Sequence, residues 1–255
     1  MKNEPKQSSG IPLVIIILVF VGVVVAGWWL YSSSTPGRDQ KGSPTPTPST
    51  ANVNAPIGAN PPNFLGSPTA AVTVEEFADF QCGACAATHP VMKEIQSIYG
   101  SRIRFVFRNF PLDIPAHDKA YEAATAAEAA GMQGKFWAMQ DQLFQNQQAW
   151  SMNPDYRKLW SDYADRIGLD VQRFQSDLAG LATKTRVDQD RARGRALSVG
   201  STPSIFINGQ LIPSPDYNVP GLRRIIDLEL QEAAAKQTQG ANSAVPAANS
   251  AVNSK

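Results

Sequence analysis

The chain has 255 residues, with 23 lysines and arginines against 22 aspartates and glutamates. This near balance argues against a nucleic-acid-binding protein, which carries a basic excess. A chain of this length buries a core without a disulfide framework, and two cysteines with two histidines leave little material for a metal site. The charged fraction of 18% is below the roughly 25% of an average globular protein. Long uncharged segments are therefore expected.

The first uncharged segment is Ile11–Leu30, twenty residues that end in bulky aromatic side chains. As a helix it would be about 30 Å long, the hydrocarbon thickness of a bilayer. We predict a transmembrane signal anchor over residues 11–31, with residues 1–10 in the cytoplasm and the rest of the chain exported. The alternative is a cleaved signal peptide, whose apolar core is usually about 7–15 residues long and precedes a cleavage site flanked by small residues.

Two further segments have low complexity. Residues 32–63 are rich in proline, serine and threonine, and we predict a linker there because such a stretch buries too little apolar surface to fold. Residues 237–255 are rich in alanine, asparagine and serine and are predicted to be a disordered tail. The globular domain is therefore predicted to span residues 64–236.

Within this domain, hydrophobic periodicity and turn signals predict an α/β order of β-α-β, a helical block, then α-β-β-α. The expected elements, in chain order, are a strand at 72–77, a helix at 81–99, a strand at 103–108, helices at 119–130, 135–145, 154–167 and 171–178, a helix at 185–197, strands at 204–207 and 210–212, and a helix at 220–235. Asn208-Gly209 predicts a type I′ hairpin turn.

The charged residues of the 185–197 helix alternate in sign, which is typical of a solvated face. They are Arg186, Asp188, Asp190, Arg191, Arg193 and Arg195. His117, next to Asp118, is expected to belong to a helix cap.

The main chemical motif is Cys82-Gly83-Ala84-Cys85, which follows a predicted strand and a short turn. A cysteine at a helix start lies near unpaired N–H groups and the positive end of the helix dipole, which stabilise a thiolate. Cys85 is one turn further on the same face, close enough to form a disulfide. Such a pair exchanges electrons with a substrate disulfide through a mixed disulfide.

The motif has three other possible interpretations. A structural disulfide closing so short a loop would contribute only about 2 kcal/mol. Half of a zinc site would need a second pair of ligands at metal spacing, and His89 and His117 do not provide one. Simple buried cysteines have no preference for this spacing. The position between strand and helix favours a redox-active pair.

A second motif, Gly200-Ser201-Thr202-Pro203-Ser204, leads into a short strand. A proline directly before a short central strand is a candidate for a cis peptide bond, whereas an ordinary trans loop proline is the more common case.

Three segments together resemble the DsbA-like thioredoxin-fold family, in the membrane-anchored bacterial branch. They are EFADFQCGAC, FRNFPLDIPAHDKAYEAATAAEAAGMQGKFWAMQDQLFQNQQAW and VGSTPSIFINGQLI. The resemblance covers residues 63–235 and implies a thioredoxin fold with a helical insertion at about 118–183. It places the protein in the bacterial cell membrane with one span and an extracytoplasmic catalytic domain.

The resemblance also implies roles for five residues. Cys82 would be the nucleophile and Cys85 the resolving thiol; Pro203 would be the cis-proline facing the disulfide, with Thr202 presenting its backbone to a bound peptide. Glu76 matches an acidic residue beneath the active site in many members. Alternatively, Glu76 is the solvent-facing member of the Glu75–Glu76 pair.

Two residues depart from the family pattern. Gly83 stands where many members have proline, and Ala84 stands where DsbA-type oxidases often have histidine. The residues between the cysteines tune thiolate stability and redox potential, so the strength of this protein as an oxidant is open.

The predicted function is thiol–disulfide exchange with reduced or unfolded exported proteins, most simply as a disulfide donor. A disulfide isomerase or reductase is the alternative within this chemistry, and a non-catalytic membrane-tethered binding module with a structural CxxC is the alternative outside it. The resemblance implies reoxidation by a membrane partner of the DsbB or vitamin-K-epoxide-reductase type. We expect a monomer, no nucleic-acid partner, and no metal or organic cofactor besides the redox-active disulfide.

Overall fold

The computed structural model describes residues 25–26, 28–29 and 54–243 of the chain. The chain divides into two units, residues 1–47 and 48–255, and the fold below is that of the second. Four residues of the first unit, at 25, 26, 28 and 29, are helical and exposed. The rest of the predicted anchor lies outside the described residues. Among the residues described, no helix combines the length and the apolar character needed to cross a membrane.

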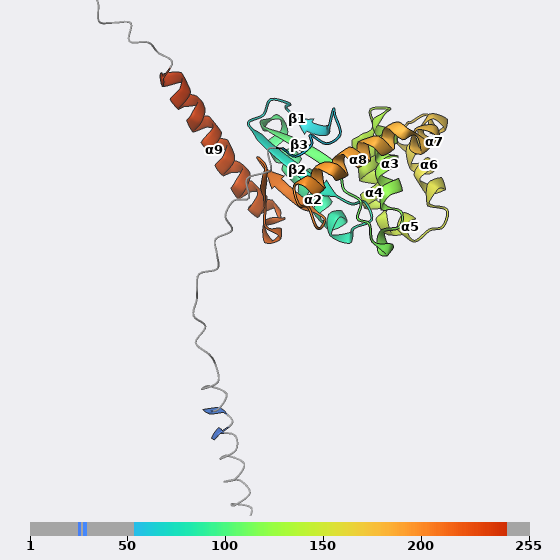
Figure 1. Ribbon diagram of the computed structural model, residues 1–255, viewed down its shortest axis with the longest axis horizontal. Helices are drawn as coiled ribbons and strands as arrows, with labels where there is room; N and C mark the ends of the chain where they lie inside the picture. Colours follow the sequence, from blue (N-terminus) through green and yellow to red (C-terminus); the bar gives the residue numbers. More distant parts are fainter. Residues whose placement is uncertain (1–24, 27, 30–53, 244–255) are drawn as a thin grey trace, which may run out of the picture. The chain divides into compact units, whose positions relative to one another are not determined.

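The second unit is built on one five-stranded sheet (Figure 1). Its strands are β1 (Asn63–Gly66), β2 (Val72–Ala78), β3 (Ile103–Asn109), β4 (Ser204–Ile207) and β5 (Gln210–Leu211). The order across the sheet is β1-β3-β2-β4-β5. The β2 and β3 strands are parallel and the other neighbouring pairs are antiparallel. The four-residue strand β1 was not predicted; it begins at Asn63, the last residue of the predicted linker, and continues into the predicted domain.

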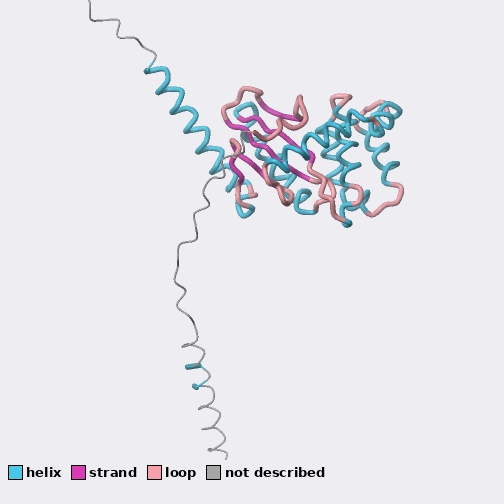
Figure 2. Tube along the Cα trace, viewed as in Figure 1, coloured by secondary structure: helices cyan, strands magenta, loops and turns pink. Residues whose placement is uncertain are grey.

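Helices surround this sheet on both faces and beside it (Figures 1 and 2). They are α2 (Gly83–Tyr99), α3 (Ala120–Gly131), α4 (Phe136–Gln145), α5 (Gln147–Ser151), α6 (Tyr156–Arg166), α7 (Val171–Ala179), α8 (Leu181–Ala196) and α9 (Val219–Ser243). In Figure 1, α3 to α7 gather beside the sheet and α8 runs back from them along it. The predicted α/β order with a helical insertion is confirmed, with α5 and β1 as additions.

The alternation of side chains along β2 explains how the two faces are covered. Val72, Val74 and Ala78 belong to the main core, on the face where α2 and α9 pack together. Phe77 points the other way, into a smaller cluster with Phe110, Val199 and Phe206. A side chain at Gly194 of α8 would collide with Phe110 and Phe77, so α8 lies directly on this second face. Both faces of β2 are therefore buried.

The hairpin prediction is consistent with the backbone. Asn208 and Gly209 both have positive φ angles, 48° and 80°, as a type I′ turn requires. The Asn208 side chain also accepts a hydrogen bond from the backbone N–H of Thr73 at 2.8 Å, which ties the hairpin to β2.

Two predicted boundaries need correction. The linker was expected to extend to residue 63, but Ala59 is already buried and its N–H donates to Asp190 of α8 at 2.8 Å. The disordered tail was expected from residue 237, but α9 continues to Ser243. In the first case, distant charged residues hold a proline-rich segment that has no apolar pattern of its own. In the second, alanines and glutamines at 233–239 support helix without needing an apolar face.

Candidate active site

The CxxC motif lies where β2 gives way to α2. Cys82 is the N-cap residue of α2, and its own N–H donates to the Asp79 carbonyl at 3.1 Å. The Asp79 carboxylate is buried and accepts from the N–H groups of Gln81 at 2.7 Å and Leu112 at 2.9 Å. The side chain of His117 bonds the same carboxylate at 2.7 Å. The prediction of a helix cap at His117 is therefore wrong, because its ring supports the loop that precedes the motif.

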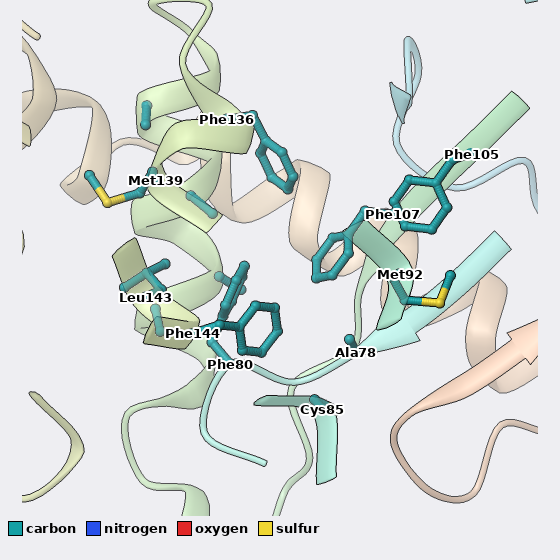
Figure 3. Packing of buried hydrophobic residues seen from close by; sticks show 14 of the residues in the cluster. Ala78, Phe80, Cys85, Met92, Phe105, Phe107, Phe136, Met139, Leu143 and Phe144 are labelled. Atoms are coloured by element: carbon teal, nitrogen blue, oxygen red, sulfur yellow. The ribbon is translucent and has the colours of Figure 1, made fainter. Parts of the chain in front are cut away.

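Phe80 anchors this loop in the core (Figure 3). Its ring centroid lies 4.8 Å from that of Phe144 in α4 and 5.5 Å from that of Phe107 in β3. Cys85 belongs to the same buried cluster and is fully inaccessible. The first turn of α2 thus packs on an aromatic cluster that joins β3 of the sheet to α4 of the inserted helices.

The two cysteines are free thiols. The loop before β4, which is distant in sequence, lies next to Cys82. The Cys82 thiol donates to the backbone carbonyl of Thr202 at 3.3 Å. The Thr202–Pro203 peptide bond is cis. The Thr202 hydroxyl is buried and has no hydrogen-bond partner within the described part of the chain. The structure therefore brings Cys82, Cys85 and Thr202 together, with Pro203 next to Thr202 in the chain.

The environments of the two thiols shift their pKa values in opposite directions. A hydrogen bond from the Cys85 thiol, with further ones from the N–H groups of Cys85 and Ala84, outweighs the opposing effect of burial and lowers the pKa of Cys82 from 9.0 to about 5. Burial, reinforced by the hydrogen bond and the charge of Cys82, raises the pKa of Cys85 far above its ordinary value. At neutral pH the pair therefore holds one thiolate, on Cys82, and one thiol, on Cys85.

Glu76 is buried on the face of β2 that carries α2. Burial raises its pKa from 4.5 to about 8, and its charge in turn raises the pKa of Cys85. Across the strand pair its partner is Ile205, whose N–H donates to the hydroxyl of Tyr217 at 3.1 Å. Tyr217, which sequence reasoning missed, also has a raised pKa, caused first by burial and then by the charges of Glu76 and Cys85.

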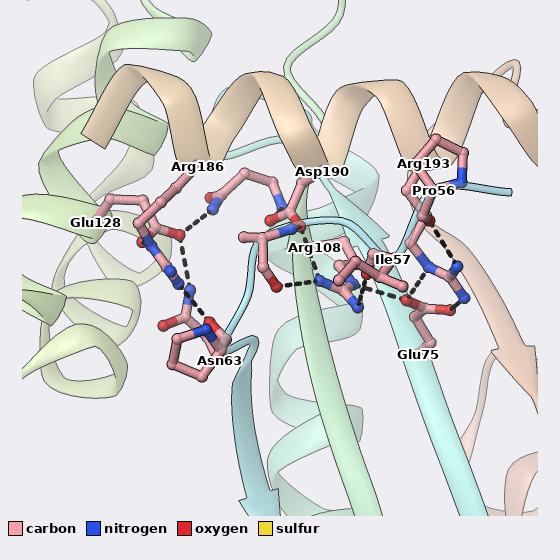
Figure 4. Close-up of polar contacts among 12 residues, drawn as sticks. Pro56, Ile57, Asn63, Glu75, Arg108, Glu128, Arg186, Asp190 and Arg193 are labelled. Carbon is pink, nitrogen blue, oxygen red and sulfur yellow. Dashed lines mark hydrogen bonds and ion pairs between the residues drawn. The ribbon is translucent and has the colours of Figure 1, made fainter. Parts of the chain in front are cut away.

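Glu75 is buried as well, so neither glutamate is solvent-facing. It lies on the α8 face and bonds Arg108 and Arg193, each at 2.7 Å (Figure 4). Burial alone would raise the pKa of Glu75, but the hydrogen bonds and charges of the two arginines outweigh it and lower the pKa. The alternative in which Glu76 faces solvent is therefore wrong. It assumed that one face of β2 meets water, whereas both faces of this strand are buried.

Arg186, Asp190 and Arg193 of α8 belong to a largely buried charge network (Figure 4). Asp190 is fully buried, bonds Arg108 at 2.9 Å, and accepts from the N–H of Asn109 at 3.1 Å. Arg186 pairs with the buried Glu128 of α3. The prediction of a solvated face is therefore wrong for Arg186, Asp190 and Arg193, whose partners lie on α3, β3 and β2. The side chains of Asp188 and Arg195 are largely exposed, as predicted.

The thioredoxin family profile matches residues 59–227. This chain belongs to the thioredoxin family. The match begins at Ala59, which agrees with the packing of that residue on α8 and not with the predicted boundary at residue 63. The expected thioredoxin-fold resemblance is thereby confirmed.

Three solved structures are similar to this chain in fold. A thioredoxin-like oxidoreductase from Silicibacter pomeroyi is 25% identical with a TM-score of 0.51, covering 69% of this chain and 92% of that one. BdbD from Bacillus subtilis in its oxidised form is 22% identical with a TM-score of 0.57, covering 69% and 98%. The thiol-disulfide exchange protein α-DsbA2 from Wolbachia pipientis is 21% identical with a TM-score of 0.55, covering 66% and 87%. This thioredoxin-family chain therefore has the DsbA-type fold with its helical insertion.

The curated proteins that are similar to this chain in sequence are named as Na⁺/H⁺ antiporters. The Na⁺/H⁺ antiporter NhaA 1 of Mycolicibacterium gilvum is 33% identical over 167 residues, which is 65% of this chain and 26% of that protein. NhaA 3 of Salinispora tropica is 33% identical over 211 residues, which is 81% and 31%. The chain thus spans about a quarter to a third of the length of these relatives. The match relates this chain to one part of them.

Proposed function

We propose that this protein is a thiol–disulfide oxidoreductase that donates the Cys82–Cys85 disulfide to thiols of exported proteins. The observation that carries the proposal is the opposite shift of the two thiol pKa values. A sulfur that is stable as a thiolate is both available as a nucleophile at neutral pH and a good leaving group, while a partner that keeps its proton does not compete with it.

The reaction follows from this asymmetry. A substrate thiolate attacks the Cys82 sulfur of the oxidised pair, the Cys82–Cys85 bond breaks, and Cys85 leaves with the bond electrons and takes up a proton. A second substrate thiolate then attacks the substrate sulfur of the mixed disulfide, and Cys82 leaves as the stabilised thiolate. The substrate has gained a disulfide, and the enzyme has gained two electrons and one proton. The low pKa of Cys82 speeds the second step, because thiols of lower pKa leave faster.

The direction of the exchange is part of the proposal. Every interaction that favours the Cys82 thiolate stabilises the reduced enzyme relative to the disulfide, and this makes the disulfide a stronger oxidant. One observation favours the alternative of an isomerase or reductase: Ala84 supplies only its backbone N–H, where a histidine would add a side-chain donor. The hydrogen bonds that are present support the oxidase.

Glu76 would relay a proton to and from Cys85, since its pKa lies near neutrality and its charge is felt at that sulfur. The cellular setting rests on the family resemblance and on the uncharged segment at residues 11–31. We place the domain outside the cytoplasm, tethered to the bacterial membrane as a monomer and reoxidised by a DsbB or vitamin-K-epoxide-reductase type partner. The chemistry as written requires no metal or organic cofactor.

A trapping experiment tests the exchange itself. In Cys85→Ala the mixed disulfide formed at Cys82 has no resolving thiol, so exported proteins should accumulate in complexes that a reductant releases. The control is the double variant Cys82→Ser with Cys85→Ala, which should trap nothing. Absence of such complexes in Cys85→Ala would favour the alternative of a binding module with a structural CxxC.

A further inference from the structure

One side chain of the helical insertion reaches the turn that carries the CxxC motif. The carboxamide nitrogen of Gln147, the first residue of α5, donates to the backbone carbonyl of Phe80 at 2.7 Å and to that of Cys82 at 2.9 Å. These acceptors lie 67 and 65 residues earlier in the chain. A carboxamide nitrogen carries two hydrogens, so this contact uses its full donor capacity.

The two carbonyls flank the turn between β2 and α2. The Cys82 carbonyl also accepts the N–H of Ala86 at 3.1 Å, the first hydrogen bond of α2. A carbonyl oxygen has two lone pairs, and here both are engaged. Gln147 therefore helps to fix the peptide plane at the start of α2, one residue before the N–H groups of Ala84 and Cys85 that face the Cys82 sulfur.

The position of Gln147 is itself fixed. Trp150, on the same short helix, is fully buried and donates its ring N–H to the Leu143 carbonyl at 2.7 Å. Its ring packs edge-on against that of Trp160 in α6, with centroids 5.4 Å apart. A helix of five residues is thus held by the core of the insertion, and Gln147 extends from it toward the motif.

A second tie acts on the same turn. Gln81 accepts from the N–H of Lys119 at 2.8 Å and donates to Asp118 at 3.0 Å, both at the start of the insertion. Residues 80, 81 and 82 are therefore all bonded to the insertion and not only to the sheet from which they emerge.

We propose that Gln147 is a positioning residue through which the helical insertion sets the redox equilibrium of the Cys82–Cys85 pair. By holding the carbonyls of Phe80 and Cys82, it keeps the sulfur of Cys82 aligned with the N–H groups of the first turn of α2. The part of the inference that concerns redox equilibrium rests on the proposed function.

The test compares Gln147→Leu with Gln148→Leu, a change at the exposed neighbouring residue of the same helix. Two quantities are measured in the full-length protein: the pH profile of Cys82 alkylation by iodoacetamide, and the equilibrium constant with glutathione. Loss of alignment should raise the pH midpoint of alkylation and make the disulfide roughly threefold to tenfold less oxidising, the equilibrium equivalent of about one hydrogen bond. Gln148→Leu should change neither quantity.

A second pair of variants covers the case in which Gln147→Leu does not fold. Gln147→Glu keeps the size of the side chain but presents acceptors to two carbonyls, whereas Gln148→Glu adds the same charge without that contact. The inference expects the larger shift in Gln147→Glu. Equal shifts within both pairs of variants would overturn it. The alkylation profile remains informative even if the wild-type protein does not exchange with glutathione, so failure of the proposed function and failure of this inference are distinguishable.

Discussion

The sulfur of Cys82 lies 3.3 Å from the carbonyl oxygen of Thr202, a residue 120 positions further along the chain. The contact needs the thiol proton, so it is lost when Cys82 ionises or enters a disulfide. The carbonyl is then free to accept a main-chain N–H from a peptide bound beside the sulfur. The availability of this acceptor therefore depends on the protonation state of Cys82, and at neutral pH, where Cys82 is a thiolate or part of the disulfide, the carbonyl is free.

The first prediction concerns the acidity of Cys82. With a pKa of about 5, its rate of alkylation by iodoacetamide should be nearly constant from pH 8 down to pH 6.5 and then fall as the pH drops through 5. The measurement is the alkylation rate of the Cys85→Ala variant, in which Cys82 is the one thiol that can react. The hydrogen bond from the Cys85 thiol is missing there, so a midpoint somewhat above 5 is expected, and a midpoint of 8 to 9 would contradict the assigned environment.

The second prediction concerns Glu76. Its folded pKa of about 8 lies above its ordinary value of 4.5, so the folded state binds a proton that the unfolded state has released. Stability should therefore decrease as the pH rises from about 4.5 to 8 and level off above that. Glu76→Gln should remove this dependence and be more stable than wild type at pH 8 by a few kcal/mol.

The measurement is chemical denaturation of the oxidised protein at pH 4 and pH 8, because the oxidised form has no thiol to titrate. A Glu76→Gln variant whose stability relative to wild type is the same at both pH values would show that Glu76 ionises normally. The exposed Glu232→Gln serves as the control and should show no such pH-dependent difference.

The sequence was sufficient for the features that rest on local pattern. The alternation of Ile103–Arg108, the apolar run Ser204–Ile207 and the Asn-Gly turn each predicted an element that the structure contains. The CxxC motif was found because its chemistry depends on a spacing within one helical turn. The place of Pro203 beside it came from the family resemblance, since no local signal links residues 82 and 203.

The features that were missed depend on partners far away in the chain. The sequence around Asp190 predicts a surface residue. In the fold, Asp190 is bonded by Arg108 of β3, which is 82 positions away, and by the N–H of Ala59, which is 131 positions away. Gln147 is one of several glutamines in a polar stretch, and only the fold brings it to the Cys82 carbonyl. Periodicity reports which face of an element is apolar, but it does not report whether a polar face is covered by another element.

The third prediction tests the buried charge network. Asp190→Ala removes the carboxylate that bonds Arg108, the N–H of Ala59 and the N–H of Asn109. Because a buried arginine would lose part of its counter-charge, the free energy of unfolding should fall by roughly 3–5 kcal/mol. Asp188→Ala, two residues earlier with a largely exposed side chain, should cost no more than about 1 kcal/mol.

Urea denaturation of both variants, in the oxidised protein, gives the comparison. Similar losses for Asp188→Ala and Asp190→Ala would mean that the network contributes no more than surface charges do. Asp190 is one of three α8 residues that bond the segment 56–62, together with Arg186 and Arg193.

The central claim is that the Cys82–Cys85 disulfide is an oxidant, and equilibration of the full-length protein with glutathione tests it most directly. The stabilised Cys82 thiolate predicts a reduction potential nearer to the roughly −120 mV of a strongly oxidising disulfide than to the −270 mV or so of thioredoxin. A potential at or below that of thioredoxin would contradict the role of disulfide donor and favour a reductase or isomerase.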